Sequence, residues 1–220
     1  MDPRALVLAH TRIAACPTCP EIRLRLVMPD CPLWRADEGA LAALGIGEPF
    51  WGFAWPGGQA LARYLLDHPT EVAGLRVLDA GAGGGVEAVA AALAGAREVV
   101  ALDADPLSAC AVELNAALNG VRIRTWTGDY AGYEGPCDVV LAGDLTYERT
   151  GAPRALGWLA RRAALGQRAL LAEPRRGFVD RAGLRSLATY RTPADCDPHG
   201  RCAQDAEVFA IDGLAKAAHE

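Results

Sequence analysis

Lysine is almost absent from this sequence. Among its 22 basic residues, Lys216 is the only lysine and the others are arginine. A Walker-type phosphate loop needs a lysine directly after its glycines, so this class of nucleotide site is excluded. Basic residues are also outnumbered, because the formal net charge is −5. We therefore expect no broad nucleic-acid surface, which would need clustered basic side chains.

The chain also lacks long apolar runs. No stretch of 18 apolar residues occurs, so no membrane-spanning helix is expected. The N-terminus shows no basic segment followed by a long apolar one, as a secretory signal would. The seven cysteines are odd in number and scattered, which favours reduced thiols. These absences predict a cytoplasmic protein without membrane contact; its oligomeric state is open, with a monomer favoured.

Two familiar kinds of site are disfavoured. Cys16 and Cys19 form a C-x-x-C pair, but Cys196 and Cys202 are spaced more widely than the second pair of a structural zinc site. The four histidines form no spacing motif, and no nucleophile elbow is present. We therefore predict no metal and no serine-hydrolase triad.

Strand and helix patterns alternate between residues 75 and 175. Apolar strands are expected at 75–80, 98–103, 137–144 and 168–174, with helices at 85–96, 105–120 and 154–165. This order is typical of a Rossmann-like, doubly wound, mostly parallel sheet in an α/β domain. Two further strands, at 189–193 and 207–212, would add an antiparallel edge.

The flanking segments are less regular. We expect helices at 3–15, 38–44, 59–69 and 178–188, a half-exposed strand at 21–27, and irregular structure at 45–58. The predicted organisation is a single folded unit. Residues 1–58 form an N-terminal extension with a loop of the active site, and residues 59–220 form the main domain.

The glycine turn after the first strand identifies a ligand class. A dinucleotide loop needs glycine where this chain has Val86. By contrast, Asp79, Gly81, Gly83 and Gly85 fill every place of acidic-x-Gly-x-Gly-x-Gly, the motif of methyltransferases that use S-adenosylmethionine. Asp79 could receive the ammonium group of that cofactor. The alternative is a turn that only packs a helix on the sheet.

Two more aspartates follow strand ends. Asp103 could accept hydrogen bonds from ribose hydroxyls, and Asp129 could meet the adenine amino group. Each alone is commonly a turn or cap residue. Together, in order along one edge of the sheet, they predict S-adenosylmethionine as cofactor, with S-adenosylhomocysteine as product.

The chain resembles the lysine methyltransferases of the electron transfer flavoprotein beta subunit, a family of the seven-β-strand class. Segments before and after the glycine turn carry this resemblance more specifically than the turn itself. They are "PEIRLRLVMPDCPLW" (20–34), "EPFWGFAWPGGQALARYLLDHP" (48–69), "GLRVLDAGAGGGVEAVAAALAGA" (74–96), "DADP" (103–106), "LN" at 114–115 and 118–119, "CDVVLAGDLTYE" (137–148) and "EPRRG" (173–177).

The resemblance implies a set of site residues and a protein substrate, the electron transfer flavoprotein beta subunit. Asp144 and Tyr147 match an Asp-x-x-Tyr motif beside the transferred methyl group, with Thr146 where the family usually has Phe. The other implied residues line the cofactor and the lysine entrance: Glu48, Phe50, Trp51, Trp55, Gly57, Gly58 and Gln59.

Asp144 also stands out from the residues alone. It ends a buried strand at the ligand edge of the sheet, where a catalytic group is useful. A lysine amine has a reference pKa of about 10.4, so the site must let it lose a proton and hold it in line. Asp144 could orient the amine; the alternative is that it caps the helix beginning near 150. Aromatic residues at 50, 51, 53 and 55 could favour a cation at the entrance.

Three functions stay open on sequence. The first is a protein-lysine N-methyltransferase, the second a methyltransferase for small nicotinamide-like amines on the same fold, and the third a binding module without catalysis. Asp144 with Tyr147 argues against the third.

Overall fold

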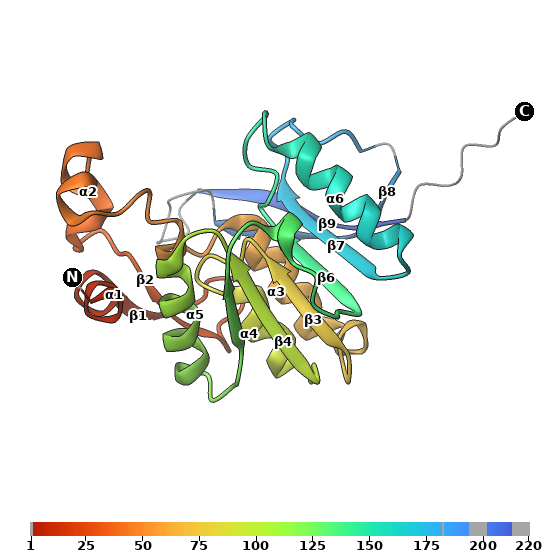
Figure 1. Ribbon diagram of the computed structural model, residues 1–220, viewed down its shortest axis with the longest axis horizontal. Coiled ribbons are helices and arrows are strands. Elements are labelled where there is room, and N and C mark those ends of the chain that lie inside the picture. Colours follow the sequence, from red (N-terminus) through yellow and green to blue (C-terminus); the bar gives the residue numbers. More distant parts are fainter. Residues whose placement is uncertain (1, 182, 194–201, 213–220) are drawn as a thin grey trace, which may run out of the picture.

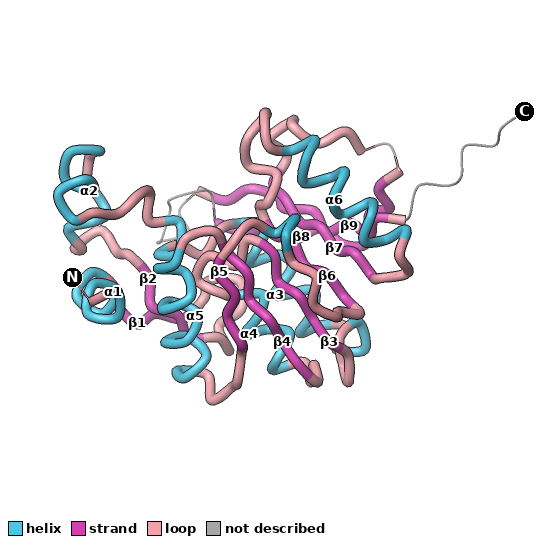
Figure 2. Tube along the Cα trace, viewed as in Figure 1, coloured by secondary structure: helices cyan, strands magenta, loops and turns pink. Residues whose placement is uncertain are grey.

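A seven-stranded sheet forms the centre of the molecule (Figures 1 and 2). The computed structural model describes residues 2–181, 183–193 and 202–212. The strand order is β5-β4-β3-β6-β7-β9-β8, and among these seven described strands only β9 runs opposite to the others, pairing antiparallel with both β7 and β8. The strands are β3 (Arg76–Ala80), β4 (Glu98–Asp103), β5 (Arg124–Thr127), β6 (Val139–Gly143), β7 (Arg168–Pro174), β8 (Leu184–Pro193) and β9 (Ala203–Ile211). The predicted Rossmann-like sheet with an antiparallel edge is confirmed.

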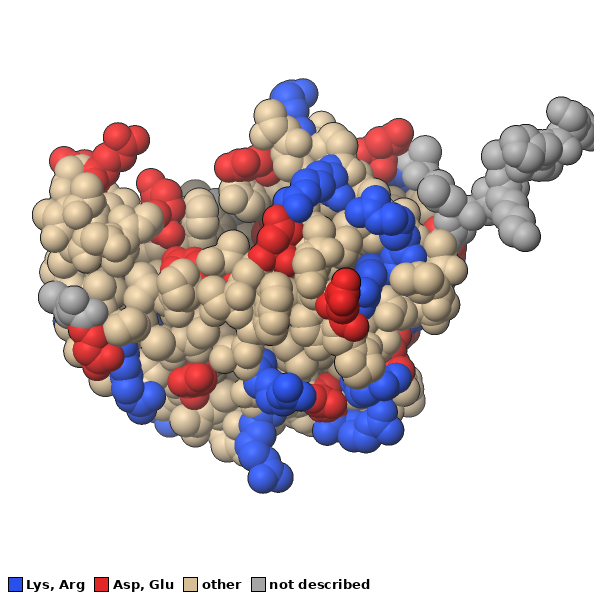
Figure 3. All heavy atoms as spheres, in the orientation of Figure 1, with Lys and Arg blue, Asp and Glu red and all other residues tan. Residues whose placement is uncertain are grey.

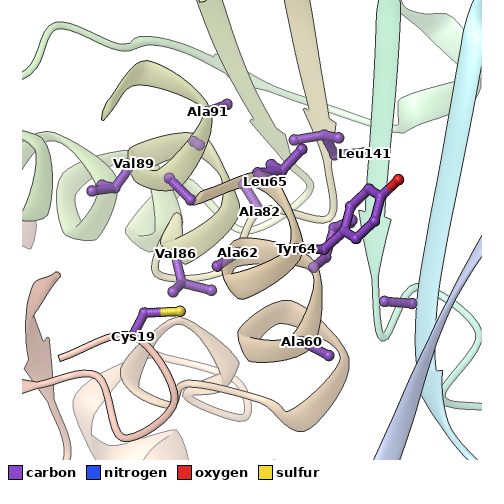
Figure 4. Packing of buried hydrophobic residues seen from close by; sticks show 14 of the residues in the cluster. Cys19, Ala60, Ala62, Tyr64, Leu65, Ala82, Val86, Val89, Ala91 and Leu141 are labelled. Atoms are coloured by element: carbon purple, nitrogen blue, oxygen red, sulfur yellow. The ribbon is translucent and has the colours of Figure 1, made fainter. Parts of the chain in front are cut away.

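Helices cover both faces of the sheet, because the parallel strands are apolar on both sides. Val77 and Leu141 face α3 (Pro56–Asp67), α4 (Val86–Leu93) and α5 (Pro106–Leu118). Leu78 and Val140 face α6 (Ala152–Ala164). Small side chains such as Ala62 let α3 approach α4 closely, as Figure 4 shows.

Local signals set the helix boundaries. The Asp105 side chain accepts a hydrogen bond from the Leu107 N–H at 2.8 Å and caps α5, whose first residue is Pro106. Gly120 follows the end of the helix with a φ of 65°. The helix predicted over 105–120 is thus confirmed together with its start and stop signals.

The N-terminal segment packs against α5 rather than forming a separate core. It contains α1 (Pro3–His10), an antiparallel hairpin of β1 (Arg12–Ala15) and β2 (Arg23–Leu26), and α2 (Glu38–Leu44). Asn115 and Asn119 of α5 accept hydrogen bonds from the β2 N–H groups of Arg25 and Arg23, at 2.7 and 2.9 Å. These contacts explain why the two "LN" pairs occur one helical turn apart.

Three local predictions are wrong. The first helix ends at His10, because residues 12–15 pair with β2 instead. The helix predicted over 59–69 begins earlier, at Pro56, with Trp55 as its N-cap. A boundary between 58 and 59 therefore cuts α3 in its first turn, and the division into extension and domain stays a prediction. The helix predicted over 178–188 is replaced from Leu184 onward by β8, which gains a full ladder of partners on β9.

Two expected absences concern only the described residues. No helix among them is both long and apolar enough to cross a membrane. They also contain no group of three or more His, Cys, Asp or Glu side chains arranged to hold a metal ion. Cys16 and Cys19 are buried free thiols beside Gln59, whereas Cys196 lies outside the described residues.

Candidate active site

A cavity of about 750 Å³ opens at the carboxyl ends of the parallel strands. Loops after β3, β4, β5, β6 and β7 line it, together with the segment before α3. The strand order reverses between β3 and β6, which is where ligands bind in open α/β sheets. The volume is within the range of small-molecule and cofactor sites.

The glycine turn shapes one wall of this cavity. Gly81, Gly83 and Gly85 have φ values of 75°, 51° and 78°, a left-handed conformation that residues with a Cβ rarely adopt. Gly81 and Gly83 line the cavity. Gly85 does not, because it serves as the N-cap of α4 behind the turn.

Asp79 lies beneath the turn rather than on the cavity wall. It is fully buried; one carboxyl oxygen accepts a hydrogen bond from the Ala88 N–H at 3.1 Å, and the other has no partner among the described atoms. Burial raises the pKa of Asp79 to about 7. Burial likewise raises the pKa of the neighbouring Glu87, and one of its carboxyl oxygens also lacks a partner in the described structure. Two buried acceptors without partners fit a cationic ligand group above them.

Asp103 and Asp129 both line the cavity, as predicted from their places at strand ends. The Asp103 carboxylate accepts hydrogen bonds from the N–H groups of Gly83 and Asp105, at 2.8 and 2.9 Å. This geometry fixes the carboxylate and leaves lone pairs for ribose hydroxyls. Asp129 caps a short 3-10 helix and pairs with Arg154 at 2.7 Å. Its carboxylate is therefore bound by Arg154 as well as by the helix N-terminus.

Asp144 is the most constrained residue of the site. Its φ is 54°, the only left-handed value of a non-glycine residue in the described chain. One carboxyl oxygen accepts hydrogen bonds from the Gly57 and Gly58 N–H groups, at 2.5 and 3.1 Å. The other pairs with Arg176. Asp144 therefore holds the N-terminus of α3, and does not cap the helix near residue 150.

The two glycines at the start of α3 do not lie on the wall of the main cavity. A Cβ on Gly57 would come within 2.7 Å of the Asp144 carboxylate and 2.8 Å of its backbone nitrogen. Gly58 approaches Gly143 of β6 in the same way. Gln59 is buried and faces the hairpin, with its amide nitrogen 2.7 Å from the Ala54 carbonyl. Gly57 and Gly58 thus allow the first turn of α3 to pack against the end of β6.

A continuous row of aromatic rings begins at the wall of the cavity, where Tyr147, Phe50 and Trp55 lie, and extends beyond it. Tyr147, Phe50, Trp55, Phe53 and Trp34 contact one another in this order, with ring centroids 5.5 to 5.8 Å apart. The Trp55 indole N–H donates to the Phe50 carbonyl at 3.0 Å, which fixes its ring. Tyr147 is 45% exposed and Phe50 43% exposed, so both can meet an incoming side chain. Glu48 lines the same opening.

Two predicted wall residues lie elsewhere. Trp51 is only 1% exposed and packs with Leu6, Leu107 and Ala111 between α1 and α5, so the prediction that it lines the entrance does not hold. Thr146 is also buried and does not line the cavity, although its neighbours Leu145 and Tyr147 do. Trp51 is buried because a large apolar side chain is more stable in the core than at the surface of the cavity.

Arg176 is the functional residue that sequence reasoning missed. It follows β7, lines the cavity, and pairs with Asp144. "EPRRG" had carried part of the resemblance without a role for either arginine. A charged residue just after the carboxyl end of a parallel strand was the signal that could have identified it.

The cavity suits a cation. Figure 3 shows acidic side chains on both sides of the notch at the upper edge of the molecule. Carboxylates outnumber arginines among the residues that line the cavity. Because S-adenosylmethionine carries a sulfonium and an ammonium group, the donor set fits this cofactor: Asp103 for the ribose, and the turn of Gly81 and Gly83 for close backbone approach. Fold and site define a methyltransferase that uses S-adenosylmethionine.

Comparisons with known proteins give the family. The "Electron transfer flavoprotein beta subunit lysine methyltransferase" of Xenopus laevis is 40% identical over 189 residues, which is 84% of this chain and 76% of that protein. Its namesake in Rattus norvegicus is 39% identical over 79% of this chain and 70% of that protein. The pattern of the family "Ribosomal protein L11 methyltransferase (PrmA)" matches residues 60–146. The chain belongs to the family of the electron transfer flavoprotein beta subunit lysine methyltransferases.

Solved structures agree on the fold. A putative RNA methyltransferase from Pyrococcus horikoshii is 18% identical with a TM-score of 0.54, over 70% of this chain and 83% of its own. Magnesium protoporphyrin IX methyltransferase from Synechocystis, solved with bound S-adenosylmethionine, is 19% identical with a TM-score of 0.51, over 69% of this chain and 76% of its own.

Proposed function

We propose that this protein transfers the methyl group of S-adenosylmethionine to a lysine of the electron transfer flavoprotein beta subunit. The observation that carries the proposal is the pairing of family membership with an open, acidic and aromatic cavity beside Asp144 and Tyr147. An acceptor side chain of a folded protein must enter from outside, and the exposed rings of Phe50 and Tyr147 suit its alkyl stem and amine.

The chain's residues act mainly by placement. The bound cofactor supplies an activated methyl group, so the protein must hold the acceptor nitrogen in line with it. We assign Asp144 to orient the amine through a hydrogen bond, since the α3 N-terminus and Arg176 fix its carboxylate. Tyr147 forms the wall on the substrate side. Asp103, Gly81 and Gly83 hold the nucleoside end.

The proposal also covers the cellular compartment and the domain organisation of the protein. Free thiols support a reducing compartment such as the cytoplasm, and they occur at Cys16, Cys19, Cys31, Cys110 and Cys137. We treat residues 1–58 as an extension that completes the active site and 59–220 as the catalytic domain, folded together.

The test is a transfer assay with purified components. The chain is incubated with methyl-labelled S-adenosylmethionine and purified electron transfer flavoprotein, and the label is located by mass spectrometry. The control is the same flavoprotein with its lysines acetylated beforehand, which removes the nucleophilic amine; a parallel arm offers a panel of nicotinamide-like amines. We expect label on beta-subunit lysines of the untreated protein only. Label confined to the small amines would contradict the proposal.

A further inference from the structure

The charge of the cavity poses a problem for the chemistry. Six carboxylates of the described chain line it, and they come from the segments before α3 and after β4, β5 and β6: Glu48, Asp103, Asp105, Asp129, Asp144 and Glu148. Such walls attract cations, but they also stabilise the protonated form of an amine. A protonated lysine has no lone pair and cannot accept a methyl group.

Two arginines of the described chain oppose this negative charge, and they lie at different places. Arg154 on α6 pairs with Asp129, in the part of the cavity predicted to hold adenine. Arg176 pairs with Asp144, at the predicted transfer site. The side chains of Asp144 and Arg176 are 9% and 18% exposed, so water screens this pair weakly.

The carboxyl groups packed behind Asp144 hold their protons to higher pH than exposed carboxyl groups, because burial raises their pKa values. Burial raises the pKa of Glu87 well above its ordinary value and that of Asp79 to about 7. Burial also raises the pKa of Glu173 on β7, whose carboxylate lies 3.3 Å from Arg181. The phenols of Tyr130 and Tyr147 line the cavity, and burial raises the pKa of Tyr147. Asp144 is the carboxylate of this cavity that Arg176 contacts directly.

We propose that Arg176 is a positioning residue that keeps the acceptor lysine neutral, by cancelling the charge with which Asp144 would otherwise hold its proton. This inference rests on the proposed function and deepens it. Asp144 can then serve as a hydrogen-bond acceptor for the amine without acting as its counter-ion. A cation beside a lysine is a general means of activating it as a nucleophile.

The expected size of the effect follows from the charges involved. Two unit charges about 4 Å apart interact by about 4 kcal/mol at an effective dielectric constant of about 20. Because the cavity is open, we expect a smaller effect, about one pH unit or tenfold in the fraction of neutral amine. Removing Arg176 takes away the positive charge that opposes Asp144 in this pair, so the amine holds its proton to higher pH.

The experiment compares three variants with the wild type. Arg176→Gln removes the charge, and Arg176→Lys restores it. The matched control is Arg175→Gln, since Arg175 is exposed and pairs with Glu207 at 3.4 Å, away from the cavity. The turnover number at saturating flavoprotein and S-adenosylmethionine is measured from pH 6.5 to 10, because it reports groups in the bound complex. Calorimetry gives cofactor affinity, and thermal melting checks folding.

We expect Arg176→Gln to be about tenfold slower than wild type at pH 7.5, and the difference to narrow as the pH rises toward 10. Arg176→Lys and Arg175→Gln should keep the wild-type profile. An equal loss at every pH would overturn the inference, as would weaker cofactor binding with an unchanged profile, which would make Arg176 a ligand of the cofactor carboxylate. The inference would also be overturned if Arg176→Lys showed the same pH profile as Arg176→Gln. If the wild type methylates no protein lysine at any pH, the proposed function itself fails.

Discussion

Asp144 combines a strained backbone with a carboxylate that is held at both oxygens. Its left-handed φ costs free energy, and such strain persists where surrounding contacts fix it. The Gly57 and Gly58 N–H groups and Arg176 provide those contacts. The residue thus links three segments that are far apart in the sequence, at the point where a methyl group would be transferred.

Asp144→Asn tests this role. An amide oxygen can still accept hydrogen bonds from α3, so we expect cofactor binding within a few-fold of wild type. Transfer should fall by about a hundredfold or more, the size of effect of a positioned acceptor in the transition state. Calorimetry with S-adenosylhomocysteine and the labelled transfer assay measure the two quantities. Undiminished transfer would show that Asp144 does not orient the acceptor.

The glycines of α3 depend on the same contact. Gly57→Ala should lower the free energy of unfolding by about 1–3 kcal/mol, because its Cβ would overlap Asp144. Gly132→Ala is the matched control, since Gly132 is exposed and a Cβ there meets nothing within 4 Å. Urea denaturation compares the two. Equal stabilities would mean that α3 can move away from β6 at no cost.

At the scale of elements, β3 and α4 enclose the carboxyl group of Asp79, which burial makes harder to ionise. Burial raises the pKa of Asp79 to about 7, far above its value in an unfolded chain. The folded state then keeps a proton that the unfolded state loses above pH 4. This contribution favours folding at low pH and is lost as the pH rises from about 4 to about 7.

Asp79→Asn should therefore stabilise the ligand-free protein more at pH 8 than at pH 5, by about 2–3 kcal/mol. Comparing each variant with the wild type at the same pH removes the contributions of other carboxylates. Denaturation at both pH values gives the difference. A difference independent of pH would indicate that Asp79 is ionised beneath the turn.

The sequence predicted those elements whose signals are local. Alternating apolar segments and caps such as Asp105, Pro106 and Gly120 located β3, β4, β6 and β7 and their helices. Leu184 to Ala188 were predicted as helix because their partner, β9, is remote in the chain. At the site, strand-end aspartates were found by position alone. The positions of Trp51 and Arg176 were not predicted from the sequence. Trp51 is placed by packing against α1, and Arg176, after the end of β7, is placed by its ion pair with Asp144.

At the scale of the whole molecule, binding of the correct cofactor should raise the thermal stability of the protein. S-adenosylhomocysteine at about 100 times its dissociation constant should add about 2.7 kcal/mol and raise the melting temperature by about 5–10 °C. The oxidised dinucleotide of nicotinamide and adenine should give no shift, because Val86 replaces the glycine that a dinucleotide loop needs. Thermal melting with each ligand checks this. A larger shift in melting temperature with the dinucleotide would show that the cavity is a dinucleotide site.

The strand order also has a consequence for synthesis of the chain. β9 is the last described strand, yet it lies between β7 and β8. While the ribosome is still adding residues 203–211, β8 has no partner in the sheet and the outer edge of β7 is unpaired. The residues that line the cavity all precede position 177 and have by then been made. A nascent chain thus carries every ligand-binding residue before its sheet can close, and an early S-adenosylmethionine encounter could help to order it.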